Sequence, residues 1–159
     1  MAAHFLSDLV SAACCFERHG ATACTDVTGF GLAGHLVEML QASGTDAELS
    51  LATVPVLEGA EQTVALGIFS SLQPQNVRIR RAITAAPEAL TQPRFLLLFD
   101  PQTSGGLLAG VPAAAAHACV DALRSLGYGE SAIIGTISTR DHHAEMITVH
   151  LSASRDREP

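Results

Sequence analysis

The chain has 159 residues, with 9 basic against 16 acidic side chains and a net charge of −7. At about 100 to 200 residues per domain, this length predicts a single domain with its own core. A hydrophobic fraction of 48% excludes a disordered chain. Such an acidic chain lacks the basic face that a nucleic acid or an anionic membrane would require. No apolar run is long enough to span a membrane, and no secretory signal opens the chain, so we expect a cytoplasmic protein with neither kind of partner.

Hydrophobic spacing and turn residues predict a mixture of helices and strands. Helices are predicted at 5–18, 28–41, 58–66, 76–86 and 112–126, where apolar residues recur at helical spacing between Gly or Pro boundaries. Strands are predicted at 21–25, 46–51, 95–99, 106–111, 131–138 and 145–151, where apolar residues alternate or form short solid runs.

The order of these elements predicts the fold class. The apolar runs 21–25 and 95–99 are interpreted as buried strands, the second one central and covered on both faces. Because the connections include both crossovers and hairpins, we predict an α/β (α+β) sandwich with a mixed β-sheet and packed helices. One domain is expected over 1–151, and the polar tail 152–159 is expected to be frayed.

Segment 25–32 (TDVTGFGL) joins a predicted strand to a predicted helix. The first amides of a helix are unpaired and carry the positive end of its dipole, so an anion can bind there, close to Thr28, Gly29 and Gly31. Asp26 would repel a bare phosphate, but a Mg²⁺ ion between this carboxylate and the phosphate oxygens reverses that repulsion. Alternatively, Asp26 or Thr28 merely caps the helix, and the segment alone leaves both interpretations open.

Segment 29–34 also matches the G-x-G-x-x-G fingerprint of dinucleotide-binding proteins, and Glu48 follows at a suitable distance. We disfavour this interpretation because Glu48 falls in the middle of the strand 46–51 and not at its carboxyl end, where it would reach a ribose. The chain also lacks the regular strand–helix alternation of a doubly wound sheet.

Segment 99–108 (FDPQTSGGLL) is a polar turn between two predicted strands. Gln102, Thr103, Ser104 and Gly105 could present hydroxyl and amide groups to an anion. The alternative is an ordinary connection whose polar residues satisfy their own backbone.

Other polar residues are interpreted without a functional role. The three arginines at 78, 80 and 81 are taken as a solvated helix face, and His142 and His143 have no third metal ligand near them in sequence. His35 is taken as a polar helix residue. The chain contains no lysine, which excludes P-loop lysine or Schiff-base chemistry on this polypeptide alone.

The four cysteines form no C-x-x-C pair, and the adjacent pair suits neither a zinc knuckle nor an ordinary disulfide framework. We interpret them as small buried apolar residues in a reducing compartment. They are Cys14, Cys15, Cys24 and Cys119.

Segments 25–32, with Gly34 and His35 after them, and 100–108 together closely resemble the C-terminal half of selenide, water dikinase. This family is related to aminoimidazole ribonucleotide synthetase, and the resemblance extends from about residue 5 to 151. It accounts for the glycine-rich match without a dinucleotide.

The resemblance implies an ATP-dependent, two-domain, dimeric enzyme that makes selenophosphate, AMP and phosphate from ATP, selenide and water with Mg²⁺. It implies that Asp26 binds magnesium, that Thr28, Gly29, Gly31 and the turn 102–105 lie near the phosphates, and that catalytic residues belong to an N-terminal ATP-binding domain. We expect that domain to be absent from this chain, and the isolated chain to be inactive.

One loop departs from the family pattern. Many members carry Gly-Gly-Thr-x-x-Asn where this chain has the segment 71–76, which keeps only Asn76. Two other functions remain as alternatives: a non-catalytic binding or assembly module of the same fold, and a dinucleotide-binding protein.

Overall fold

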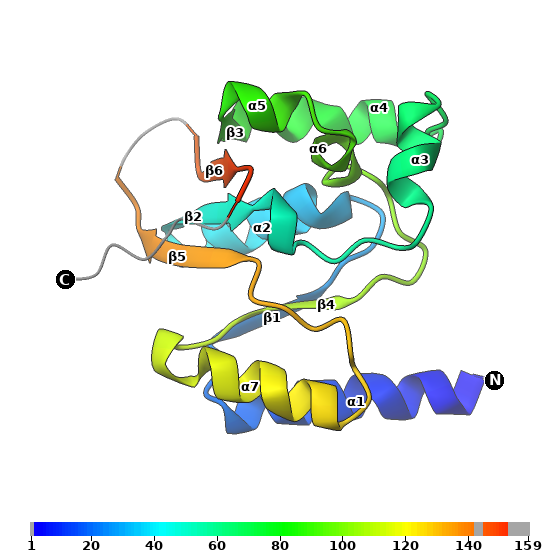
Figure 1. The fold of residues 1–159 in the computed structure, drawn as a ribbon. Coiled ribbons are helices and arrows are strands. Elements are labelled where there is room, and N and C mark those ends of the chain that lie inside the picture. Colours follow the sequence, from blue (N-terminus) through cyan, green and yellow to red (C-terminus); the bar gives the residue numbers. More distant parts are fainter. Residues whose placement is uncertain (1, 142–144, 153–159) are drawn as a thin grey trace.

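The computed structural model describes residues 2–141 and 145–152, and it shows a layered arrangement of helices and two sheets (Figure 1). The segment containing His142 and His143 lies outside the described residues. No helix in the described ranges is long and apolar enough to cross a membrane.

The α-helices and 3₁₀-helices cover much of the chain. Their bounds are α1 Ala2–Arg18, α2 Gly31–Ser43, η1 Leu51–Thr53, α3 Ala60–Ala65, α4 Gln73–Asn76, η2 Val77–Ala82, α5 Pro87–Leu90, α6 Pro93–Leu97 and α7 Ala113–Ser125. The strands are β1 Ala23–Asp26, β2 Thr45–Ser50, β3 Ile83–Ala85, β4 Leu107–Gly110, β5 Gly135–Thr139 and β6 Ile147–His150.

The strands form two sheets. β1 and β4 make an antiparallel two-stranded ribbon, and the other four strands form a sheet in the order β3-β6-β2-β5. In that sheet β6 runs parallel to both β2 and β3, whereas β5 is antiparallel to β2. The prediction of an α/β fold with a mixed sheet and packed helices is therefore confirmed.

The four-stranded sheet and α2 enclose the larger core, which α5 and α6 also line. Alternation places Ala47 and Leu49 of β2 and Ile147 and Val149 of β6 on the buried side. A second, smaller core lies between α1 and α7 beneath the β1–β4 ribbon (Figure 1). The ribbon thus lies between the two packed regions.

The predicted central strand 95–99 is wrong, because this segment belongs to a helix, α6, and to the turn that follows it. Pro93 occupies the first turn of α6, where a missing amide hydrogen costs nothing. Phe95, Leu98 and Phe99 are buried as expected, but a solid apolar run has no periodicity that separates a buried strand from a buried helix.

Two further elements differ from the prediction. The helix predicted at 76–86 ends at Ala82, because Ile83 and Thr84 leave the 3₁₀-helix and pair with β6 in parallel. The strand predicted at 21–25 is not fully buried, because it lies in a two-stranded ribbon with alternate residues exposed.

Candidate functional site

The two segments that carry the sequence resemblance lie edge to edge. Asp26 at the end of β1 is paired with Leu107 at the start of β4. Beyond the ribbon, the amide of Val27 donates to the carbonyl of Gly106 over 2.8 Å, and the amide of Gln102 donates to the carbonyl of Thr28 over 3.0 Å. Segments 25–32 and 100–108 therefore form one continuous surface, although they are far apart in the sequence.

Asp26 is exposed at the end of this ribbon. The alternation of β1 directs it and Cys24 to the same face, away from the half-buried Ala23 and Thr25. Partial desolvation and the neighbouring Asp26 carboxylate raise the pKa of the Cys24 thiol. Cys24 thus remains protonated at neutral pH and lacks the thiolate that a nucleophile needs.

The turn before α2 uses Gly31 to meet the second segment. Gly31 has a φ of 69°, and a Cβ built there would lie 2.9 Å from the carbonyl carbon of Phe99. Its amide donates to the Thr28 carbonyl over 3.0 Å, and the amide of Ala33 donates to the Leu98 carbonyl over 2.8 Å. Two amides near the start of α2 are therefore already engaged, and Gly31 serves the close approach of two backbones.

Gly105 has a similar structural role. A Cβ on this residue would lie 2.0 Å from the carbonyl oxygen of Val27, a distance that no side chain tolerates. Gly29, in contrast, is exposed and has open space where a Cβ would be. Of the glycines selected from the sequence, Gly29 alone is free of such a packing requirement.

The polar residues of the turn divide into engaged and exposed ones. The side-chain amide of Gln102 donates to a carboxylate oxygen of Asp100 over 2.8 Å, which orients both groups. Thr103 and Ser104 at the tip are exposed. The hydroxyls at 103 and 104 are therefore open to solvent and to any further group brought against this face.

His35 contributes a contact that the sequence interpretation missed. Its side chain is buried, and its Nε2 lies 3.2 Å from the hydroxyl of Thr28. On its other side Nδ1 lies 3.3 Å from a carboxylate oxygen of Glu38, one helical turn later. The i, i+3 spacing of His35 and Glu38 was the sequence signal that could have predicted their contact. With Glu38 on one side of its ring, His35 holds the Thr28 hydroxyl on the other.

The side chain of Asn76 joins segment 25–32 to Phe99, the residue immediately before segment 100–108. Its Nδ2 donates to the carbonyl of Gly29 over 2.8 Å and to the carbonyl of Phe99 over 3.1 Å. Asn76, the one residue of 71–76 that fits the resemblance, therefore ties the turn before α2 to the residue that precedes segment 100–108. This contact is structural and requires no ligand.

Within residues 2–141 and 145–152, the carboxylate of Asp26 belongs to no chelating cluster of side chains. Among the described residues, the one group of three or more Cys, His, Asp or Glu able to surround an ion lies elsewhere, at Cys15, His19 and Cys119. One carboxylate suits Mg²⁺, which keeps waters and phosphate oxygens in its shell. The exposed carboxylate of Asp26 therefore fits one ligand position of such a shell.

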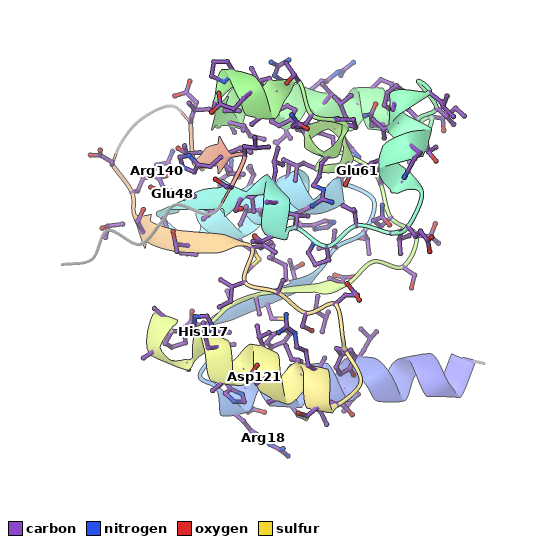
Figure 2. All side chains as sticks on the ribbon, viewed as in Figure 1. Arg18, Glu48, Glu61, His117, Asp121 and Arg140 are labelled. Carbon is purple, nitrogen blue, oxygen red and sulfur yellow. The ribbon has the colours of Figure 1, made fainter. Side chains whose placement is uncertain are left out.

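The dinucleotide fingerprint lacks its structural context. β1 and β2, on either side of α2, belong to different sheets, so the parallel strand–helix–strand unit is not formed. Glu48 lies in mid-β2 (Figure 2), with an oxygen 3.5 Å from Nε2 of His150.

The three clustered arginines are exposed, and the guanidinium of Arg80 lies 5.7 Å from the centre of the Phe95 ring.

Residues 6–147 match the protein family described as "AIR synthase related protein, C-terminal domain". The chain belongs to the AIR synthase related family. As such a C-terminal domain it has curated relatives that are named selenide, water dikinase, which confirms the resemblance seen in the two segments.

Three relatives illustrate the match of this AIR synthase related domain. The enzyme of Bordetella bronchiseptica is 41% identical over 128 residues, which is 80% of this chain and 36% of the relative. That of Geobacter metallireducens is 38% identical over 122 residues, 77% of this chain and 35% of the relative. Selenide, water dikinase 2 of Peptoclostridium acidaminophilum is 32% identical over 123 residues, again 77% and 35%. The chain spans about a third of the length of these relatives.

Proposed function

We propose that this chain is the C-terminal domain of a selenide, water dikinase. Together with an N-terminal ATP-binding domain it would convert ATP, selenide and water to selenophosphate, AMP and phosphate. The observation that carries the proposal is the junction of segments 25–32 and 100–108 into one surface with Asp26 exposed on it. The names of the relatives support the choice of reaction.

The residues of this surface have distinct roles in the proposal. Asp26 would hold one side of a Mg²⁺ ion, which when bound neutralises the crowded phosphate oxygens. Gly29, Thr103 and Ser104 offer the accessible backbone and hydroxyls that face the phosphates. Four residues that we expected near the phosphates instead shape the surface, because they make the contacts between segment 25–32 and the turn that begins at Phe99. They are Thr28, Gly31, Gln102 and Gly105.

Because Asp26 is a single carboxylate, the isolated chain is proposed to be inactive and to bind ATP and Mg²⁺ weakly or not at all. The remaining metal ligands and the reactive group would come from the N-terminal domain, and a homodimer and a cytoplasmic location are part of the same proposal. Purified chain that turned over ATP and selenide alone would contradict this.

A domain-exchange experiment tests the function directly. The C-terminal third of the Bordetella bronchiseptica enzyme is replaced by this chain, and selenophosphate is followed by phosphorus NMR. We expect an active chimera whose activity falls to background in D26N. The matched control is D121N, an exposed carboxylate on α7 (Figure 2), which is expected to be fully active.

Two outcomes decide against parts of the proposal. A fully active D26N chimera removes the magnesium assignment. A folded chimera that binds ATP but makes no selenophosphate contradicts the assignment of the reaction.

A non-catalytic binding or assembly module is the second candidate, and one observation favours it. Segment 57–72 exposes five large apolar side chains, and Leu57 and Leu66 are 78% and 77% exposed. Such residues suit a surface that another domain covers. Light scattering of the isolated chain tests the alternative, because a strict monomer that binds no N-terminal domain argues against an assembly role.

A further inference from the structure

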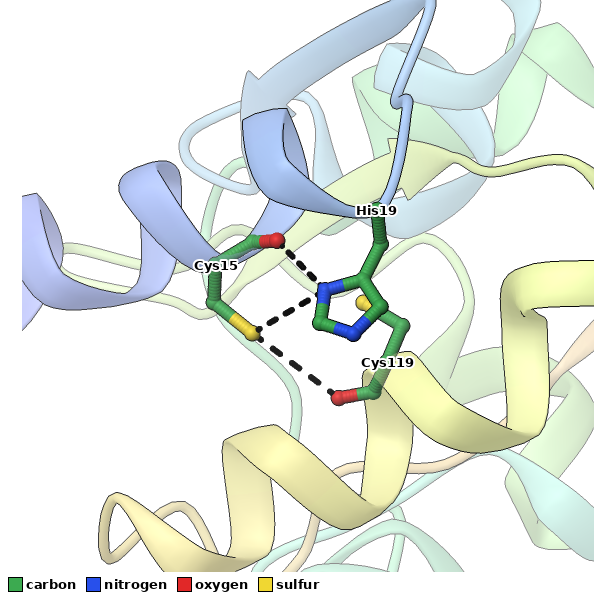
Figure 3. Close-up of side chains that lie close together, drawn as sticks. All are labelled: Cys15, His19 and Cys119. Carbon is green, nitrogen blue, oxygen red and sulfur yellow. Dashed lines mark hydrogen bonds between the residues drawn. The ribbon is translucent and has the colours of Figure 1, made fainter.

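Three potential metal ligands gather between the two helices of the smaller core. Cys15 lies in the last turn of α1, His19 follows directly after the helix, and Cys119 comes from the middle of α7 (Figure 3). One ligand atom from each residue lies within 4.8 Å of the others. The cluster shares no residue with the surface around Asp26.

The surroundings of this cluster are apolar. Cys15 and Cys119 are 4% and 2% exposed, and Ala12 and Leu123 complete the same buried group. Burial, together with the nearby Cys15 thiol, raises the pKa of Cys119. As a free thiol, Cys119 is therefore a poor nucleophile at neutral pH.

His19 is held in a defined orientation. Its Nδ1 lies 2.8 Å from the backbone carbonyl oxygen of Cys15 and 3.7 Å from the Sγ of the same residue. When Nδ1–H donates to that carbonyl, the lone pair is left on Nε2. A backbone carbonyl that orients a histidine in this way is the usual outer contact of a metal-binding imidazole.

The spacing is close to that of a bound ion. Zinc bonds of about 2.3 Å to sulfur and about 2.0 Å to nitrogen place neighbouring tetrahedral ligands about 3.5 to 3.8 Å apart. Ligand atoms within 4.8 Å of one another therefore need to approach by at most about 1 Å. Side-chain rotation of two cysteines and one histidine provides such movement.

We propose that Cys15, His19 and Cys119 bind a thiophilic divalent cation of the zinc class, which links α1 to α7. Thiolate and imidazole ligands select such an ion over Mg²⁺, which prefers oxygen. Binding releases the two thiol protons to solvent, so two thiolates balance the double positive charge. Because His19 is only half-buried, solvent can reach this side of the cluster, and a water molecule would supply the fourth ligand of the proposed site.

Metal titration of the whole chain tests the site. The protein is reduced, stripped of metal with a chelator and titrated with Co²⁺, which gives a thiolate-to-metal charge-transfer band, and then with Zn²⁺ in competition. We expect one equivalent per chain and a higher midpoint of thermal unfolding with zinc. C15A and C119A are expected to lose the band.

C14A is the matched control, because Cys14 is the neighbouring thiol on the same helix but is exposed. It is expected to bind as the unchanged chain does. Since C15A or C119A could fail to fold, H19Q provides a second test that keeps both buried thiols, and it is expected to weaken Zn²⁺ binding at least 10-fold.

Three results would overturn the proposal. The first is that the folded, reduced chain takes up no stoichiometric metal. The second is that C14A abolishes metal uptake whereas C15A retains it, and the third is that Cys15 and Cys119 form a disulfide in place of binding metal. None of them affects the proposed dikinase function, whose test uses Asp26.

Discussion

The side-chain amide of Asn76 donates to the backbone carbonyl of Gly29 over 2.8 Å. A second hydrogen bond from the same nitrogen reaches the carbonyl of Phe99. One amide therefore holds the turn before α2 against the end of the 95–99 segment, and it does so beside the surface that carries Asp26.

Replacement of Asn76 by alanine is expected to reduce the free energy of unfolding. Both carbonyls would lose a partner, which costs about 1 to 3 kcal/mol. Urea denaturation of N76A measures the change, with the exposed neighbour Q75A as control, for which a change within about 0.5 kcal/mol is expected. Equal stability of the two variants would show that the Asn76 contacts contribute nothing.

A comparison of Gly31 and Gly44 distinguishes the cost of a positive φ from the cost of a steric clash. Both have positive φ, 69° and 64°, but a Cβ at Gly31 meets the Phe99 backbone at 2.9 Å, whereas none is near a Cβ at Gly44. We expect G44A to cost about 1 to 2 kcal/mol for the left-handed conformation. G31A should cost clearly more in the same thermal or urea unfolding experiment, and similar costs would contradict the close approach.

Gly105 and Gly106 test whether the glycines of the turn serve packing. Only at Gly105 does an added Cβ strike a neighbour, the Val27 carbonyl oxygen at 2.0 Å. G105A is expected to destabilise the chain or prevent its folding, because the β1–β4 junction must open. G106A is expected to stay within about 1 kcal/mol of the unchanged chain, and circular dichroism during urea unfolding compares the two.

Thr28 is expected to stabilise the buried imidazole of His35. T28V keeps the side-chain shape but removes the hydroxyl 3.2 Å from Nε2, which costs about 1 to 2 kcal/mol. T22V is the control, because it makes the same conservative change at an exposed position before β1. Denaturation midpoints that shift equally in both variants would argue against the Thr28–His35 contact.

The thiol of Cys24 is expected to respond to the charge of Asp26. Because desolvation and then the Asp26 carboxylate raise the Cys24 pKa, D26N should move the pH profile of Cys24 alkylation to lower pH. Mass spectrometry of the alkylated peptide measures the rate at each pH, and alkylation of Cys14 in the same sample is the internal reference. An unchanged profile would mean that the two groups do not interact.

Periodicity determined many of the elements but left the short apolar runs ambiguous. The helix ending at Arg18 and the one following Pro112 were predictable because their apolar residues recur over several turns. Segment 95–99 was not, since five apolar residues in succession fit a buried strand and a buried helix equally. Its state depends on Pro93 and on how Phe95, Leu98 and Phe99 pack into the larger core, and that packing is a tertiary property.

By itself the sequence determined the fold class and, through two short segments, the family, and it singled out Asp26 for the proposed magnesium site. Those segments are short, contiguous patterns of residue types, so they can be recognised in the sequence without a structure. Only the tertiary structure decided that Gly31 and Gly105 are needed for contact between the segments, that Asn76 and His35 support them, and that Cys15, His19 and Cys119 meet. Apart from the short steps from Thr28 to His35 and from Cys15 to His19, these relationships join residues distant in the chain, and no periodicity encodes which distant backbones and side chains come within contact distance.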